Sequence, residues 1–289
     1  MAFTQNTTIR LHYTVSSLNK VHPKHAKKFV LIHGLFFGNL AGWYPLIHQK
    51  LSEHGEVLCY DLRGHGLSEM VGGSYLIQDH LNDLKELLIE LGWWDYDLCF
   101  IGHSFGGRLG LAMATSRRLE ETHAIPIRKE MGRYLQTHLL KSDQVCMIDP
   151  PLNPTQKEDN DTTNIPYENL FQYDLDTIKS WLPPSLTLLM SKQGRQLRKL
   201  FKRWQRLLEE TSFSTDMQSF QKVDEAELQT LYKQGSILFG KQSGCIKDLD
   251  LVKEHLAESN LLQIDGGHFL LNECPHKVIE FLLTQIGGE

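Results

Sequence analysis

The stretch DLCFIGHSFGGRLGLAMATSRR, residues 97–118, decides the fold, because it joins an apolar run to a helical pattern through a serine that lies between glycines. Residues 97–101 predict a strand and residues 105–118 a helix. Gly102-His103-Ser104-Phe105-Gly106 fits G-x-S-x-G, in which the serine occupies a strained turn and its neighbours are small so that strand and helix can approach each other. This context predicts that Ser104 is a nucleophile and not part of an inert glycine-rich corner.

Short apolar runs that alternate with helical patterns predict a doubly wound α/β sheet. Most of the runs are continuous, as expected for strands that are buried on both faces. Residues 75–92 carry leucines at helical spacing, and residues 275–288 begin with a proline and end in glycines, so both ranges are predicted helices. Strands separated by helices imply parallel crossovers. The predicted strands are residues 9–15, 28–33, 56–60, 97–101, 145–149, 236–240 and 260–264.

A break in this alternation divides the chain into a core and an insertion. Residues 150–235 contain turn-rich and helical segments but no strand candidate. We therefore predict an α/β core domain formed by residues 1–149 and 236–289, with a helical cap inserted at 150–235. Residues 116–144 are more than a helix-to-strand connection normally requires, and we expect an extra helix near Pro126 within them.

Composition and charge exclude several classes of protein. The chain has 289 residues, of which 41% are hydrophobic and 22% charged, as in an ordinary soluble protein with one large core. Its net charge of -5 and its pI near 6.3 provide no overall basic field. Because nucleic-acid binding depends on such a field, we expect no nucleic-acid partner.

The cysteines and the N-terminal sequence predict a cytoplasmic protein. The five cysteines form an odd set without paired spacing, which favours a reducing compartment over a disulfide framework. The first residues lack a basic segment followed by an apolar one, as a signal peptide would have. In addition, no stretch reaches the roughly 18 apolar residues that a membrane span needs.

A serine nucleophile needs a base that takes its proton and donors that hold the oxyanion. His268 stands in a loop between the last predicted strand and the last predicted helix, from which it can reach the carboxyl edge of the sheet. Backbone N–H groups are available in the loop after residues 28–33 and at the start of the helix that follows Ser104. We predict that His268 is the base and that the backbone amides of Leu35 and Phe105 form the oxyanion hole.

Four motifs together resemble the α/β-hydrolase-fold serine hydrolases. In chain order they are HGLFFGN (33–39), DLRGHGLSE (61–69), GHSFGG (102–107) and GGHFLLNECPHKVIEFL (266–282). The sequence is most similar to the small esterase and acyl-thioesterase branch whose first loop reads HGLFG. This resemblance implies an α/β-hydrolase fold, a nucleophile, acid and histidine in that chain order, and no cofactor. It covers residues 28–115 and 236–286, and no motif of the predicted cap contributes to it.

The acid that would orient His268 departs from the commonest pattern of the family. Most relatives have an aspartate in a G-x-x-D sequence after the strand represented here by 236–240, and this chain has Ser243 at that position. The HGLFG-type esterases instead carry an aspartate after the preceding strand, where Asp149 stands. We predict that Asp149 is the acid, with Asp248, Asp250 or no carboxylate partner as the alternatives.

Other candidate residues have structural interpretations that we favour. His33, His65 and His103 each border a glycine turn, so we expect packing or turn roles for them. Arg63 and Arg108 are candidates for binding an acidic substrate group, and the sequence at Arg108 resembles that of the α/β-fold lyase of menaquinone synthesis. The sequence has no H-E-x-x-H or paired C-x-x-C motif, so we expect no metal site.

Residues 192–210 predict a basic amphipathic helix, in which lysines and arginines alternate with apolar residues at helical spacing. We favour a cap helix whose apolar face covers the active site. The alternatives are weak contact with an anionic membrane and contact with an acidic partner such as an acyl carrier.

These observations predict a cytoplasmic serine hydrolase, of the carboxylesterase or thioesterase type, that forms an acyl-enzyme on Ser104. Its expected partner is a small-molecule acyl ester or thioester. Two alternatives stay open. One is a C–C bond hydrolase or lyase that uses the same three residues, and the other is a catalytically silent α/β-hydrolase that acts as an interaction scaffold.

Overall fold

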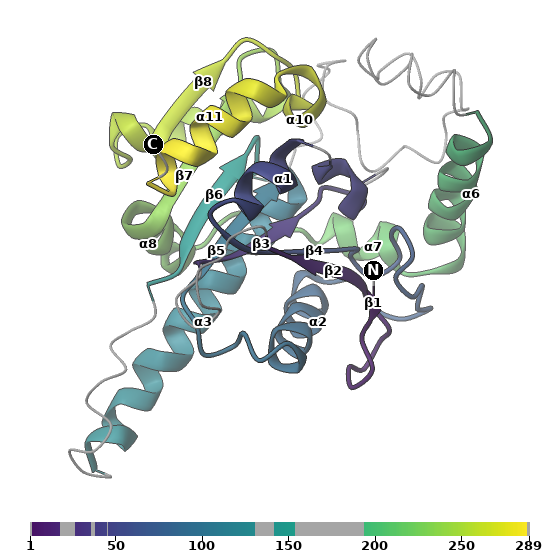
Figure 1. Cartoon of the computed structure of the whole chain (residues 1–289), viewed down its shortest axis with the longest axis horizontal. Helices are drawn as coiled ribbons and strands as arrows, with labels where there is room; N and C mark the ends of the chain where they lie inside the picture. The colour runs from purple at the N-terminus through teal and green to yellow at the C-terminus, as the bar shows by residue number, and fades with distance from the viewer. Residues whose placement is uncertain are drawn as a thin grey trace.

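One mixed sheet forms the centre of the molecule (Figure 1). The computed structural model describes residues 2–17, 27–35, 38–44, 46–130, 142–153 and 194–287, with the backbone alone for 121–130, 194–198, 201 and 218. Within these residues eight strands pair in the order β1-β2-β4-β3-β5-β6-β7-β8. Their bounds are β1 (Ala2–Phe3), β2 (His12–Ser16), β3 (Lys27–Ile32), β4 (Gly55–Tyr60), β5 (Leu98–His103), β6 (Gln144–Ile148), β7 (Gly235–Gly240) and β8 (Leu261–Ile264).

The pairing agrees with the predicted doubly wound α/β sheet. β1 pairs with β2 and β2 with β4 in antiparallel fashion, whereas every pairing from β4 to β8 is parallel. Each of the seven predicted strands corresponds to one of the strands β2 to β8. β1 was not predicted, because two residues are too few for a recognisable pattern.

Helices cover both faces of the sheet. α1 and α11 lie on one face, and α2, α3 and α8 lie on the other (Figure 1). The described helices are α1 (Leu46–Ser52), α2 (Ile77–Glu90), α3 (Phe105–Glu130), α6 (Gly194–Glu210), α7 (Phe213–Gln218), α8 (Glu225–Gln234), α9 (Leu249–Val252), α10 (Leu270–Glu273) and α11 (Pro275–Gln285). Short 3-10 turns are η2 (Leu40–Trp43), η5 (Gly244–Asp248) and η6 (Glu258–Asn260).

The two faces explain why the strands have continuous apolar sequences. Along β3, Phe29 and Leu31 pack into the core beneath α1 and α11, whereas Val30 and Ile32 pack into the core beneath α2 and α3. Successive side chains of a strand point to opposite faces, so every position must be apolar when both faces are covered. The sheet therefore has a separate hydrophobic core on each side.

α3 differs from the prediction for residues 116–144. Instead of ending and giving way to a new helix near Pro126, α3 continues to Glu130 and projects beyond the edge of the sheet (Figure 1). The sequence has no glycine between Gly110 and Gly132 that would end the helix. Residues 131–141 lie outside the described part of the chain.

The predicted cap is described at 150–153 and 194–235, so its boundaries stay a prediction. Within this range α8 packs against α3 and β7 and forms the last part of the crossover from β6 to β7. α8 begins with a capping box in which Asp224 accepts a hydrogen bond from the Glu227 amide. α8 is therefore part of the layer of helices on the sheet.

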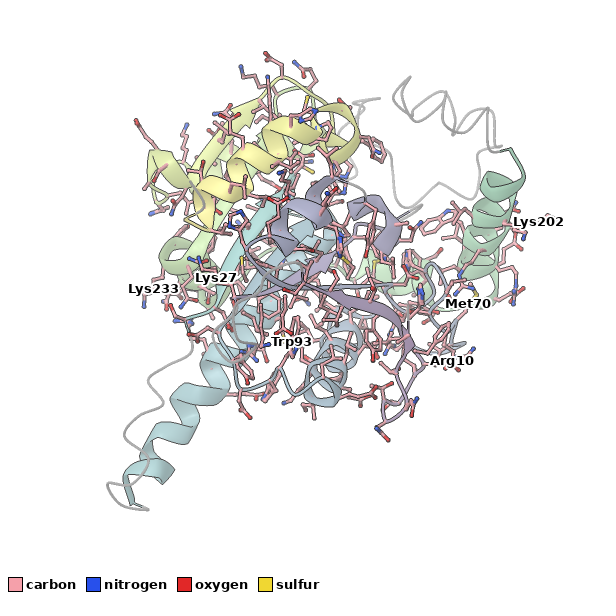
Figure 2. All side chains as sticks on the ribbon, viewed as in Figure 1. Arg10, Lys27, Met70, Trp93, Lys202 and Lys233 are labelled. Carbon is pink, nitrogen blue, oxygen red and sulfur yellow. The ribbon has the colours of Figure 1, made fainter. Side chains whose placement is uncertain are left out.

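α6 corresponds to the predicted basic amphipathic helix. Its Trp204 and Leu207 are buried in the core, and Arg203 donates a 3.0 Å hydrogen bond from Nε to the Gly64 carbonyl. Lys199 and Lys202 are exposed, and Figure 2 shows Lys202 on the outer side of α6. The weak contact with an anionic membrane or an acyl carrier stays a prediction. Among the described residues, the structure has no helix with both the length and the apolar character needed to cross a membrane.

Candidate active site

Ser104 occupies the turn between β5 and α3 in a left-handed conformation. Its φ is 54°, in a region that non-glycine residues seldom adopt. The turn is possible because the neighbouring glycines leave room: a Cβ atom on Gly102 would lie 2.2 Å from the Gly106 carbonyl, and one on Gly106 would lie 2.1 Å from the Ile32 carbonyl oxygen. β5, α3 and the end of β3 therefore meet around Ser104.

The loop after β3 lies directly against Ser104. A Cβ atom on Gly34 would be 3.0 Å from the Ser104 Cβ, so the backbone that carries Leu35 passes beside the serine. His33 fixes this loop, because its Nδ1–H donates to the Gly34 carbonyl at 2.7 Å and its Nε2 accepts from the Leu62 amide at 3.0 Å. Phe105 is the first residue of α3, where backbone N–H groups have no partner within the helix. The two predicted oxyanion donors thus belong to the segments on either side of Ser104.

His268 links the two other predicted residues. Its Nε2 lies 2.9 Å from the Ser104 Oγ, and its Nδ1 lies 2.6 Å from the Asp149 Oδ2. Because a carboxylate only accepts, Nδ1 carries a proton, and Nε2 is free to accept the hydroxyl hydrogen of Ser104. Residues that stand 164 and 119 positions apart in the sequence are thereby joined in one chain of hydrogen bonds.

Asp149 follows β6, with a φ of 49° and no exposed surface. Its Oδ1 accepts from the Gly240 amide at 3.0 Å, and its Oδ2 also accepts from the Ser243 hydroxyl. These bonds satisfy a carboxylate that has no contact with water. Ser243 occupies the position at which most relatives have the catalytic aspartate. Its hydroxyl donates to Asp149, the carboxylate that contacts His268 in this chain.

The two alternative acids lie elsewhere. The buried Asp248 accepts from the Leu152 amide at 2.7 Å and from the Asn153 side chain at 2.7 Å, and it fixes the chain just beyond Asp149. Asp250 is exposed and forms a 2.7 Å ion pair with Lys253. The structure therefore brings Asp149 to His268 and places Asp248 and Asp250 in structural contacts.

Two residues hold the backbone of the His268 loop. The Nε2–H of His103 donates to the His268 carbonyl at 2.7 Å, so His103 does more than pack beside the turn. Burial lowers the pKa of His103 to about 4, so the ring is neutral near pH 7. Glu273 accepts from the Gly267 amide at 2.7 Å and from the Phe269 amide at 3.2 Å. The backbone is therefore fixed on both sides of His268.

Cys245 stands beside the histidine and the acid. Its Sγ lies 3.8 Å from the His268 Nδ1, and its amide donates to the Ser243 Oγ at 3.1 Å. Burial, together with the charge of Asp149, raises the pKa of the thiol well above its usual range. Cys245 and Glu273 were not predicted from the sequence, because they come close to the site only through the folding of separate loops. Ser243 was noted only as the residue at the usual position of the acid, and its contact with Asp149 was not predicted.

Arg63 and Arg108 are both committed to internal contacts. Arg63 donates to both oxygens of Asp83, each at 2.6 Å, and to the Ser74 carbonyl at 2.5 Å. Arg108 forms a two-point ion pair with Glu227 of α8, and both side chains are buried. These contacts occupy the N–H groups that a substrate carboxylate would need. Both arginines therefore have the structural role that we favoured from the sequence.

Aromatic rings pack against one another from Phe105, next to Ser104, to helices α6 and α7. The Phe105 ring lies 5.2 Å from the His80 ring and 5.9 Å from the Phe220 ring, measured between centroids. Farther along, Phe213 of α7 packs edge-on to Tyr75 and to Trp204 of α6. The Trp204 ring also lies 6.2 Å from the His65 ring, so the apolar face of α6 contacts the loop after β4.

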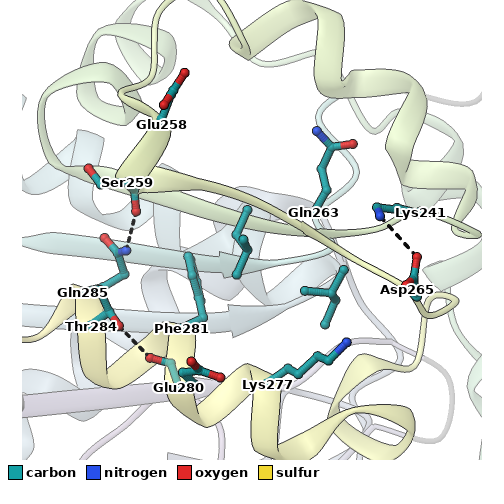
Figure 3. Close-up of a pocket in the computed structure, with 12 residues that line it drawn as sticks. Lys241, Glu258, Ser259, Gln263, Asp265, Lys277, Glu280, Phe281, Thr284 and Gln285 are labelled. Atoms are coloured by element: carbon teal, nitrogen blue, oxygen red, sulfur yellow. Dashed lines mark hydrogen bonds and ion pairs between the residues drawn. The ribbon is translucent and has the colours of Figure 1, made fainter.

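A separate hollow lies at the far edge of the sheet, between β8 and α11 (Figure 3). Its volume is about 530 Å³, and polar groups at its rim include Lys241, which pairs with Asp265 at 3.2 Å. Ser104, Asp149 and His268 are not among its lining residues. This hollow is distinct from the candidate active site.

Comparison with known proteins agrees with the fold. A sequence model of the Alpha/beta hydrolase family matches residues 29–281, most of the chain. The chain belongs to this family. Among curated proteins, an uncharacterised protein of Mycobacterium bovis is 31% identical over 86 residues, which are 29% of this chain and 24% of the relative. The match thus spans about a quarter of that relative's length.

Solved alpha/beta hydrolase structures are similar to nearly the whole chain. An enol-lactonase from Burkholderia xenovorans aligns with a TM-score of 0.68 and 17% identity, covering 99% of this chain and 100% of the enzyme. A thermophilic esterase from Thermogutta terrifontis aligns with a TM-score of 0.64 and 17% identity, covering 99% and 97%. At this level of identity the similarity shows the shared fold.

Proposed function

We propose that this protein is a serine hydrolase that cleaves carboxylic esters or thioesters through an acyl-enzyme on Ser104. The observation that carries the proposal is the continuous chain of hydrogen bonds from the Ser104 Oγ through His268 to the buried Asp149 carboxylate. Membership of the Alpha/beta hydrolase family supports hydrolysis as the type of reaction.

In the proposed reaction the Ser104 Oγ attacks the acyl carbon while its proton passes to the Nε2 of His268. The tetrahedral oxyanion accepts hydrogen bonds from the Leu35 and Phe105 amides. His268 then returns the proton to the leaving alcohol or thiol, and the acyl group stays on Ser104. A water molecule repeats these steps and releases the carboxylic acid. Asp149 keeps the imidazole in the tautomer that accepts at Nε2, and the reaction requires no cofactor.

The choice of esters and thioesters rests on the surroundings of Ser104. Phe105, the residue after Ser104, and Phe220, whose ring lies 5.9 Å from that of Phe105, suit an apolar acyl or aromatic group. With Arg63 and Arg108 engaged in buried contacts, neither supports recognition of a carboxylate substrate. This weakens the case for the lyase activity that the sequence at Arg108 suggested.

A panel of p-nitrophenyl esters and acyl thioesters with short, medium and long chains tests the proposal. We expect turnover of at least one ester or thioester, and we expect Ser104→Ala to lower kcat by about a millionfold. Absence of turnover with every substrate, in a protein whose Ser104 reacts with a fluorophosphonate, would favour C–C bond cleavage. Absence of both turnover and labelling in the folded protein would favour the silent scaffold.

A further inference from the structure

Asp149, Cys245 and His268 offer three metal-ligand atoms at one place beside the proposed active site. The carboxylate oxygen, the thiol sulfur and the imidazole Nδ1 all lie within 4.8 Å of one another. They come from three separate segments, namely the end of β6, the η5 turn after β7 and the loop after β8. We propose that these three residues form a Zn²⁺ site and that Zn²⁺ bound there switches off Ser104.

The donors match zinc in type and in charge. Zn²⁺ binds oxygen, nitrogen and sulfur ligands, and histidine, cysteine and aspartate are its usual ligands in proteins. One carboxylate, one thiolate and one neutral imidazole give a complex with Zn²⁺ that has no net charge. A neutral complex suits this position, because Asp149 is fully buried and a net charge would be costly there.

The two distances that involve His268 need only a small adjustment. Tetrahedral bonds of about 2.0–2.3 Å place neighbouring ligand atoms about 3.3–3.6 Å apart. The Cys245 Sγ and the His268 Nδ1 are 3.8 Å apart, whereas the His268 Nδ1 and the Asp149 Oδ2 are 2.6 Å apart. Entry of the metal therefore requires the imidazole and the carboxylate to separate by about 0.7 Å, the difference between 3.3 and 2.6 Å. The His268 side chain is 24% exposed, which leaves the site open on one side.

Hydrogen bonds that would orient the ligands are already present. The Gly240 amide and the Ser243 hydroxyl both donate to the Asp149 carboxylate. The His268 Nε2 lies 2.9 Å from the Ser104 Oγ, which can accept a hydrogen bond. A metal-binding histidine usually donates from its second ring nitrogen to such a partner, and these outer contacts strengthen metal binding.

Zinc binding would remove the base that activates Ser104. The metal takes the place of the His268 Nδ1 proton, which shifts to Nε2, and it displaces the proton of the Cys245 thiol, which passes to solvent. The imidazole then carries its single proton on Nε2 and donates to Ser104, so it has no lone pair to accept the hydroxyl proton. The inhibitory effect rests on the proposed function, whereas binding of the metal does not.

Cobalt provides a direct readout of binding, since Co²⁺ takes the same ligands and a thiolate on Co²⁺ gives a near-ultraviolet charge-transfer band. The chelator-treated full chain is titrated with Co²⁺ as wild type, Cys245→Ser and Cys245→Ala, with Cys274→Ser as the matched control. Cys274 is the other partly exposed cysteine. We expect the band in wild type and Cys274→Ser, displacement of Co²⁺ by Zn²⁺, and loss of the band in both Cys245 variants. Absence of the band in wild type, or a band of equal strength in the Cys245 variants, would overturn the site.

A second measurement separates the site from the proposed function. Fluorophosphonate labelling of Ser104 and ester turnover are followed while Zn²⁺ is added to the same proteins. We expect Zn²⁺ to suppress both in wild type, and half-suppression in the Cys245 variants to require at least about tenfold more Zn²⁺. A metal-free protein that binds Co²⁺ but never labels would contradict the proposed function and leave the metal site intact. If wild type and all variants turn over esters and are equally sensitive to Zn²⁺, the result would contradict the metal site and leave the proposed hydrolase function intact.

Discussion

Two residues of the candidate site share an unusual backbone conformation. Ser104 and Asp149 are the non-glycine residues of the described chain with positive φ, and each directly follows a parallel strand near the centre of the sheet. Such a conformation costs of order 1–3 kcal/mol and persists only where the surrounding structure compensates for it. The Ser104 and Asp149 amides bond to the Ile148 and Leu238 carbonyls, so the strand pairing extends into both turns. The sheet thereby sets the positions of both side chains.

Asp149→Asn tests the role of the buried carboxylate. An asparagine can present its amide group to the His268 Nδ1 and favour the wrong imidazole tautomer, so we expect kcat to fall by about four orders of magnitude. Asp250→Asn is the matched control, because Asp250 is exposed and pairs with Lys253. Ester kinetics and a urea unfolding curve for each variant provide the measurement. Unchanged kcat in a folded Asp149→Asn protein would show that Asp149 does not orient His268.

At the scale of elements, the loop between β8 and α10 places the imidazole. His103 and Glu273 hold its backbone through one carbonyl and two amides, while His268 contacts Ser104 and Asp149 through its side chain. Three hydrogen bonds to the backbone and two to the ring leave the imidazole little freedom to turn. These contacts indicate that the loop is already ordered before substrate binds.

Glu273→Ala is expected to lower kcat roughly 10- to 100-fold with little change in KM, because the His268 ring would lose its alignment while the substrate surface stays intact. Glu273→Gln keeps one accepting oxygen and should recover part of the rate. Glu280→Ala, at an exposed position of α11, is the control. Steady-state kinetics distinguish the variants. A purely structural role would instead lower the unfolding free energy and leave the kcat of the folded fraction unchanged.

The ion pair between α3 and α8 leads to a prediction about stability. Arg108→Met leaves Glu227 buried without its partner and is expected to lower the free energy of unfolding by about 3–5 kcal/mol. The double variant Arg108→Met with Glu227→Leu should recover most of this loss, because no uncompensated charge remains. Lys50→Met, in an exposed pair with Glu53, is expected to cost less than about 1 kcal/mol. Urea unfolding measures all three, and an equal loss in the single and double variants would contradict this account.

The elements that sequence analysis predicted well are those with local signals. Continuous apolar runs identified seven strands, and Pro275 correctly marked the start of α11. The contacts that were missed depend on distant parts of the chain. Arg108 meets Glu227 from 119 positions away, and Ser243 meets Asp149 from 94 positions away. No local sequence pattern predicts these contacts, because they depend on how the crossovers bring distant loops to the same edge of the sheet.

At the scale of the whole molecule, four buried histidines should make the fold sensitive to acid. Burial lowers the pKa of each: to about 3 for His65, to about 4 for His103, well below 6.5 for His80, and below 6.5 for His33. Between pH 6.5 and these lowered values the unfolded chain binds protons that the folded chain does not, so stability falls as the pH falls. His65 and His103 should each cost roughly 2 kcal/mol between pH 7 and pH 5.

His80→Phe isolates one of these contributions. Within the described part of the chain neither ring nitrogen of His80 has a hydrogen-bond partner, and the ring lies against Phe105 and Tyr75. Phenylalanine fits these apolar contacts and cannot bind a proton, so we expect a protein at least as stable at pH 7. We also expect a smaller loss of stability on acidification from pH 7 to pH 5. Urea unfolding at both pH values provides the test, and an identical pH dependence in the two proteins would contradict it.

The central claim is that Ser104 is an activated nucleophile, and fluorophosphonate labelling followed by intact mass measurement tests it most directly. The account predicts that the wild-type chain gains the mass of one phosphonyl group, located on the peptide that contains Ser104. It also predicts that Ser104→Ala gains none, and that the exposed control Ser219→Ala labels like wild type. A folded wild-type protein that stays unlabelled, or a Ser104→Ala protein that labels as fast as wild type, would contradict the account.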